Sequence, residues 1–137
     1  MIVSKSLSLG LTIIELVVVL IISAVLSSIV IPNYTRLQIH AKYSHLKQTA
    51  YSIQMAIETF FLYHGTYPNL YAIETLIDLL MDEVFIKQIP INPFTNKPLT
   101  NNDSSGKITY IFDASNNRYT IEVYDKKNET ILLLLGN

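Results

Sequence analysis

The chain has 137 residues, half of them hydrophobic, with a formal net charge of −1 and no cysteine. Its largest basic cluster is the pair Lys126 and Lys127, so we expect no nucleic acid as main partner, because such binding depends on positive charge. The absence of cysteine excludes a disulfide framework and a thiolate metal site. The length allows one compact domain beyond the N-terminal segment.

Residues 11–32 form the first predicted element, an apolar run with one charged residue, Glu15. A helix needs about 20 such residues to cross a bilayer, so we expect a transmembrane helix. A carboxylate near its start is costly unless it has a partner or lies at the membrane interface. If the chain is cut after Gly10, Leu11 becomes a free amino terminus one helical turn from Glu15. The Leu11 ammonium of a second copy could then pair with this carboxylate.

The sequence GLTIIE, from Gly10 to Glu15, is followed by the apolar run and by Pro32. This pattern resembles the processing signal of type IV pilins and of the pseudopilins of type II secretion systems. The resemblance implies that prepilin peptidase cuts after Gly10 and methylates the amino group of Leu11. It also implies that Glu15 guides assembly into a helical filament and that Pro32 kinks the helix. Phenylalanine is usual in the family at the position of Leu11, but methylation acts on the amine, so we expect leucine to be tolerated.

The same resemblance divides the chain into a leader (1–10), a transmembrane and filament-core helix (11–32) and an extracytoplasmic pilin-like domain (33–137). It implies a single-pass inner-membrane protein that becomes part of an extracytoplasmic or cell-surface filament after assembly. The implied partners are further copies of the chain, prepilin peptidase, the inner-membrane assembly platform and, before assembly, membrane lipid.

The long helix is predicted to continue past Pro32 to Tyr63, where Gly65 supplies a stop. Within residues 24–32, β-branched side chains, two serines and Pro32 weaken the helix, so we expect this stretch to lose helical hydrogen bonds in a filament. Beyond it, apolar residues recur at alternating steps of four and three and predict one buried stripe: Ile39, Tyr43, Leu46, Ala50, Ile53, Ile57 and Phe60.

A short second helix and a small sheet are predicted for the rest of the chain. Apolar residues between Leu70 and Met81 predict the helix, and three prolines predict a turn-rich loop over residues 90–98. Turn residues separate three strands, at 107–112, 118–124 and 129–135, and favour an antiparallel meander with one face on the long helix. The last strand lacks alternation, so we expect the helix to cover one face and a neighbouring subunit the other. The predicted fold class is α+β, a long and partly transmembrane N-terminal helix packed against a three-stranded antiparallel sheet.

No catalytic, cofactor or metal site is predicted. His40 and His45 lie on different faces of the helix, and His64 is far from both. The oxygen-rich loops 101–103 and 113–117 carry one carboxylate each, whereas an ordered calcium loop needs several, so we interpret both loops as turns.

Two classes of function remain for a chain that we expect to be no enzyme. The first is a structural subunit of a type IV pilus-like filament, and a major-type pseudopilin of a type II secretion system shares its signal. The second is a membrane-anchored extracytoplasmic binding module. Glu15 after Gly10 favours the first class, because an anchor has no use for an unpaired acid near its start.

Overall fold

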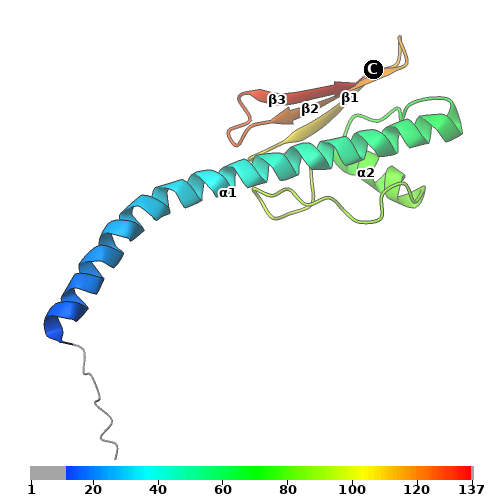
Figure 1. Ribbon diagram of the computed structural model, residues 1–137. Helices are drawn as coiled ribbons and strands as arrows, with labels where there is room; N and C mark the ends of the chain where they lie inside the picture. Colours follow the sequence, from blue (N-terminus) through cyan, green and yellow to red (C-terminus); the bar gives the residue numbers. More distant parts are fainter. Residues whose placement is uncertain (1–11, 137) are drawn as a thin grey trace, which may run out of the picture. The chain divides into compact units, whose positions relative to one another are not determined.

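The computed structural model describes residues 12–136, and the side chains of residues 29–33 are not described. The chain divides into two compact units, with the boundary between Gln38 and Ile39. Figure 1 shows the elements in chain order, which are α1 (Ile13–His64), α2 (Ile73–Asp82), β1 (Ile108–Asp113), β2 (Arg118–Tyr124) and β3 (Ile131–Gly136).

The long helix predicted from the sequence is α1, which has 52 residues. It ends at His64 because Gly65 takes a φ of +75°, a left-handed conformation that residues with side chains rarely adopt. The predicted end of the helix is therefore confirmed. The helical backbone of α1 runs through Pro32 without interruption. The kink at Pro32, and the loss of helix over residues 24–32 in a filament, stay predictions.

The transmembrane part of the predicted fold class is wrong. Across residues 12–136, the structure contains no helix with the length and apolar character that crossing a membrane requires. Residues 11–32 are apolar for most of their length, but several positions are polar: Thr12, Glu15, Ser23, Ser27 and Ser28. The α+β class and the three-stranded antiparallel sheet are present in the structure.

The second unit is built around the predicted apolar stripe of α1. Leu46, Ala50, Ile53 and Ile57 are fully buried, whereas Ile39 at the start of the stripe is 37% exposed. A helix face with this spacing packs on a partner surface because that removes its apolar side chains from water. Here the partner surface consists of the sheet and the buried face of α2, which join the same hydrophobic core.

The sheet is an antiparallel meander with strand order β1-β2-β3, as predicted. Figure 1 shows it running along the C-terminal half of α1. Its inner face alternates along each strand, so that Tyr110 pairs with Ile121 and Ile121 pairs with Leu135 across the ladder. The buried members of this face include Ile108, Tyr110, Tyr119, Ile121 and Val123.

The outer face of β3 is open to solvent in a single chain. Leu133 and Leu135 pack against the core, while Leu134 is 62% and Ile131 45% exposed. The inner cover predicted for this strand is therefore present. Cover of the outer face by a neighbouring subunit stays a prediction.

Three tyrosine hydroxyls donate hydrogen bonds that join elements within the second unit. Tyr119 donates to Glu58 Oε1 over 2.5 Å and Tyr67 donates to Glu58 Oε2 over 3.2 Å, which ties β2 and the turn after α1 to the helix. Tyr110 donates to the carbonyl of Pro68 over 2.8 Å. Each hydroxyl therefore enters the core with an acceptor already supplied.

Candidate assembly site

The first turn of α1 carries a reciprocal hydrogen-bond arrangement between Thr12 and Glu15. The backbone N–H and the hydroxyl of Thr12 both donate to Glu15 Oε2, each over 2.8 Å. The backbone N–H of Glu15 donates in return to the Thr12 hydroxyl oxygen over 3.3 Å. This is a capping box, which satisfies N–H groups that have no partner inside the helix.

The carboxylate of Glu15 is exposed and held in its charged form. The hydrogen bonds from the Thr12 backbone and side chain lower the pKa of Glu15 below its ordinary value. Its second oxygen, Oε1, accepts no hydrogen bond from the described residues. The site therefore presents a fixed negative charge with one oxygen available to a cation.

Thr12 is a hydrogen-bond partner of Glu15 that the sequence analysis missed. We interpreted Glu15 as an acid without a partner in its own chain, although the spacing Thr-x-x-Glu is itself the pattern of a capping box. Because this local partner exists, Glu15 alone does not discriminate between a filament subunit and a binding module. The surface around Glu15 is needed to distinguish these two classes of function.

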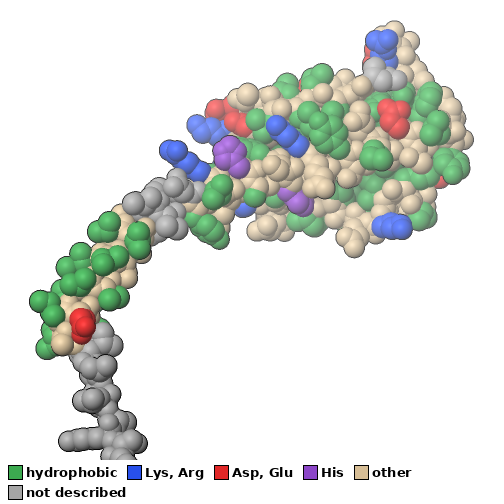
Figure 2. Space-filling view, in the orientation of Figure 1, with side chains coloured by type: hydrophobic (Ala, Val, Ile, Leu, Met, Phe, Trp, Pro, Cys, Tyr) green, Lys and Arg blue, Asp and Glu red, His purple; other side chains and the backbone are tan. Residues whose placement is uncertain are grey.

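That surface is apolar on every side of the helix. Figure 2 shows hydrophobic side chains over the visible face of this segment, and the large ones along its length are all more than 40% exposed. They are Ile13, Ile14, Leu16, Val17, Val18, Val19, Leu20, Ile21, Ile22, Val25 and Leu26. Beside the capping box, residues 13–28 therefore form a continuous apolar surface with Glu15 as their single charged side chain. We call this surface the apolar arm.

The structure gives less information on the other three predicted site residues. Gly10 and Leu11, the expected cleavage and methylation positions, lie outside the described residues. Pro32 belongs to the helical backbone of α1, and its side chain is not described. Of the four, the structure therefore gives contacts for Glu15 alone.

Comparisons of this chain with known proteins found no relative. A scan against protein-family models, a search of curated proteins and a search of solved structures each found no match to this chain.

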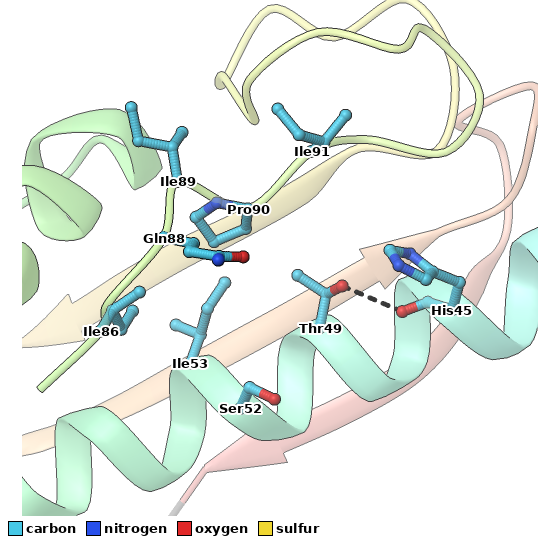
Figure 3. Close-up of a pocket in the computed structure, with 9 residues that line it drawn as sticks. All are labelled: His45, Thr49, Ser52, Ile53, Ile86, Gln88, Ile89, Pro90 and Ile91. Atoms are coloured by element: carbon cyan, nitrogen blue, oxygen red, sulfur yellow. Dashed lines mark hydrogen bonds between the residues drawn. The ribbon is translucent and has the colours of Figure 1, made fainter.

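A groove lies in the second unit between α1 and the segment after α2 (Figure 3). It has a volume of about 320 Å³, and its walls include His45, Thr49, Ile53 and Ile89. The Thr49 hydroxyl donates to the carbonyl of His45 over 3.0 Å, so its proton is already used by the helix. His45 is the only titratable side chain in this lining, and catalysis by proton transfer or nucleophilic attack needs a second group beside it. We assign no reaction to this groove.

The predicted turn chemistry is present at Asp113. Its carboxylate accepts hydrogen bonds from the side-chain amide of Asn116 and the backbone N–H of Ser115, which lower the pKa of Asp113. Both bonds belong to the tight turn between β1 and β2. Over the described part of the chain, no group of three or more His, Cys, Asp or Glu side chains is placed to hold a metal ion.

Proposed function

We propose that this chain is a structural subunit of a type IV pilus-like filament, held together by packing of the apolar arm against the arms of neighbouring copies. The observation that carries the proposal is the exposure of this arm on all sides, from Ile13 at 84% to Leu26 at 59%. A helix that is hydrophobic all round requires a surrounding apolar environment. The chain's own core does not include any of these side chains.

Further copies of the chain supply such an environment. Burial of apolar surface contributes about 25 cal/mol for each Å² removed from water, so covering the arm is strongly favourable. Each copy brings the same arm, and one copy can be buried between several others. A repeated head-to-tail contact that does not close into a ring generates a helical filament.

Glu15 gives this packing its register. Apolar helices slide past one another at little cost, whereas a charge pair fixes one axial offset. Cleavage after Gly10 would create the cation, because Leu11 then carries a free ammonium group. In the proposed filament this ammonium binds Glu15 Oε1 of a neighbouring copy, while Oε2 stays with Thr12.

The proposal requires processing and export of the chain. Its partners are prepilin peptidase, which cuts after Gly10 and methylates Leu11, and an assembly platform that adds subunits to the filament. The assembled filament lies outside the cytoplasm, at the cell surface. The role is structural, with no cofactor and no reaction of the chain's own.

Mass spectrometry of filaments sheared from producing cells tests the proposal. We expect the chain in this fraction to begin at an N-methylated Leu11, and we expect the Glu15→Gln chain to be processed but lost from the fraction. Glu129→Gln, which changes an exposed glutamate outside the arm, is the matched control and should assemble normally. An intact Met1 terminus in cells that contain the peptidase, or normal assembly of Glu15→Gln, would contradict the proposal.

A further inference from the structure

A hollow of about 470 Å³ lies in the second unit between two turns of the chain, residues 94–97 and 100–105. We call it the polar hollow. Apart from Phe94, every side chain of its lining carries a polar group. Its volume is in the range of sites that hold small molecules, about 300–1,000 Å³.

Hydrogen bonds from two asparagine side chains fix both walls of the polar hollow. Asn92 is fully buried, and its Nδ2 donates to the carbonyls of Ser105 and Gly106 over 2.9 and 3.1 Å. The same side chain accepts the backbone N–H of Phe94 through Oδ1 over 2.9 Å. From the other side, Asn128 Nδ2 donates to the carbonyl of Asp103 over 2.9 Å. The two turns therefore keep their spacing without a ligand.

Phe94 is held as a rigid aromatic wall. Gly106 has a φ of +64°, and a Cβ atom at this position would overlap Cδ2 of Phe94. The absence of a side chain at Gly106 lets the ring close down on the turn. The ring also contacts Tyr43, with 5.2 Å between ring centroids. Little conformational freedom is left for Phe94 to lose on binding.

Several polar groups of the lining have no partner among the described residues. The side chains of Lys97, Asn102 and Ser104 are exposed and make no hydrogen bond or ion pair with those residues. The Thr95 hydroxyl is buried and has no partner in the described part of the chain. Asp103 uses Oδ2 to accept the backbone N–H of Thr100 over 3.2 Å, which leaves its Oδ1 available. A buried polar group without a partner, as the Thr95 hydroxyl is, needs an explanation, and a ligand supplies one.

We propose that the polar hollow binds a neutral, hydroxyl-rich ring compound, a monosaccharide unit. The available groups mix donors and acceptors, as hydroxyls and an amide do, and each hydroxyl of a sugar can both donate and accept. The charges of Lys97 and Asp103 oppose each other, so the lining favours neither an anion nor a cation. The C–H face of a sugar ring can pack on Phe94. This site involves no residue of the apolar arm and does not depend on the assembly role.

Saturation-transfer NMR on the full chain, with a sugar-free detergent covering the apolar arm, tests the proposal. The probes are glucose, galactose and N-acetylglucosamine at millimolar concentration, with inorganic phosphate as the charged comparison. We expect transfer to at least one sugar, and we expect Asn102→Ala and Ser104→Ala to weaken its binding by about fivefold each, the effect of one lost hydrogen bond. Ser115→Ala, in a turn outside the polar hollow, is the control and should bind as the unchanged chain does.

The side chains of Asn102 and Ser104 make no hydrogen bond with the described residues, so both variants should keep the thermal midpoint of the unchanged chain. Absence of transfer to all three sugars would overturn the proposal. The same conclusion would follow if a chain carrying both Asn102→Ala and Ser104→Ala bound sugar with the affinity of the unchanged chain, or if phosphate competed with the sugar for the site.

Discussion

The two ends of α1 are equally helical and have opposite surroundings. Residues 13–28 expose their apolar side chains on every side, whereas residues 39–64 bury one stripe in the core of the second unit. The sequence shows the reason, because polar and charged residues flank the stripe in the second segment and are nearly absent from the first. A helix with one apolar stripe is covered by its own chain, and a helix that is apolar all round needs others to cover it.

Matched substitutions of isoleucine by alanine should show the largest difference in stability between the two ends of α1. Ile53 is fully buried and Ile21 is 58% exposed. We expect Ile53→Ala to lower the free energy of unfolding by about 2–5 kcal/mol through the cavity that it leaves. Ile21→Ala should change it by less than about 0.5 kcal/mol. Urea unfolding of the full chain, followed by tyrosine fluorescence, measures both, and equal effects would remove the distinction between the two ends.

Two glutamates on α1 allow a second comparison. Glu58 accepts the hydroxyls of Tyr67 and Tyr119 at the edge of the core, whereas Glu15 is exposed and bound to Thr12. Glu58→Ala removes an acceptor from two partly buried hydroxyls and should cost about 1–3 kcal/mol of stability. Glu15→Ala should leave the unfolding of the second unit unchanged. Unfolding curves that respond equally to the two substitutions would contradict the role of Glu58.

Alkaline pH should weaken the second unit. Burial raises the pKa of Tyr110, and burial with the hydrogen bond to Glu58 raises that of Tyr119. In the unfolded chain both ionise near an ordinary pKa of about 10, so above that pH the folded form binds more protons than the unfolded form. Stability should be retained below about pH 10 and fall above it, by at most about 1.4 kcal/mol per pH unit for each tyrosine.

Tyr119→Phe should make this alkaline loss less steep, and urea midpoints measured across the range provide the test. The apolar arm contains no tyrosine, so its helical circular dichroism should not follow the same pH dependence. An unfolding free energy that does not fall as the pH rises past this range would contradict the assignment of both tyrosines to the core.

Periodicity predicted most of the fold. The buried stripe of α1, the end of this helix before Gly65 and the antiparallel meander depend on local patterns of apolar and turn residues, and all three were found. The predicted membrane span is wrong because polar residues interrupt a run that is long enough to cross a bilayer. The outer face of β3 is open in one chain, since alternate leucines face opposite sides even where every residue is apolar.

The sites were less predictable from sequence than the fold. Thr12 was within reach, because its spacing to Glu15 is a local capping pattern. The polar hollow could not be predicted, because the side chain of Asn92 binds residues that lie 13 and 14 positions further along the chain. Nothing in the local sequence around Asn92 indicates those partners. Contacts of this kind follow from the packing of the whole unit.

The most direct test of the assembly role is a cryo-electron microscopy map of filaments formed by this chain. The account predicts that residues 13–28 of each copy lie at the filament axis, surrounded by the same segments of neighbouring copies. It also predicts that Glu15 of one copy contacts the amino terminus at Leu11 of another. A filament in which the apolar arms do not touch one another, or in which Glu15 faces solvent, would contradict it.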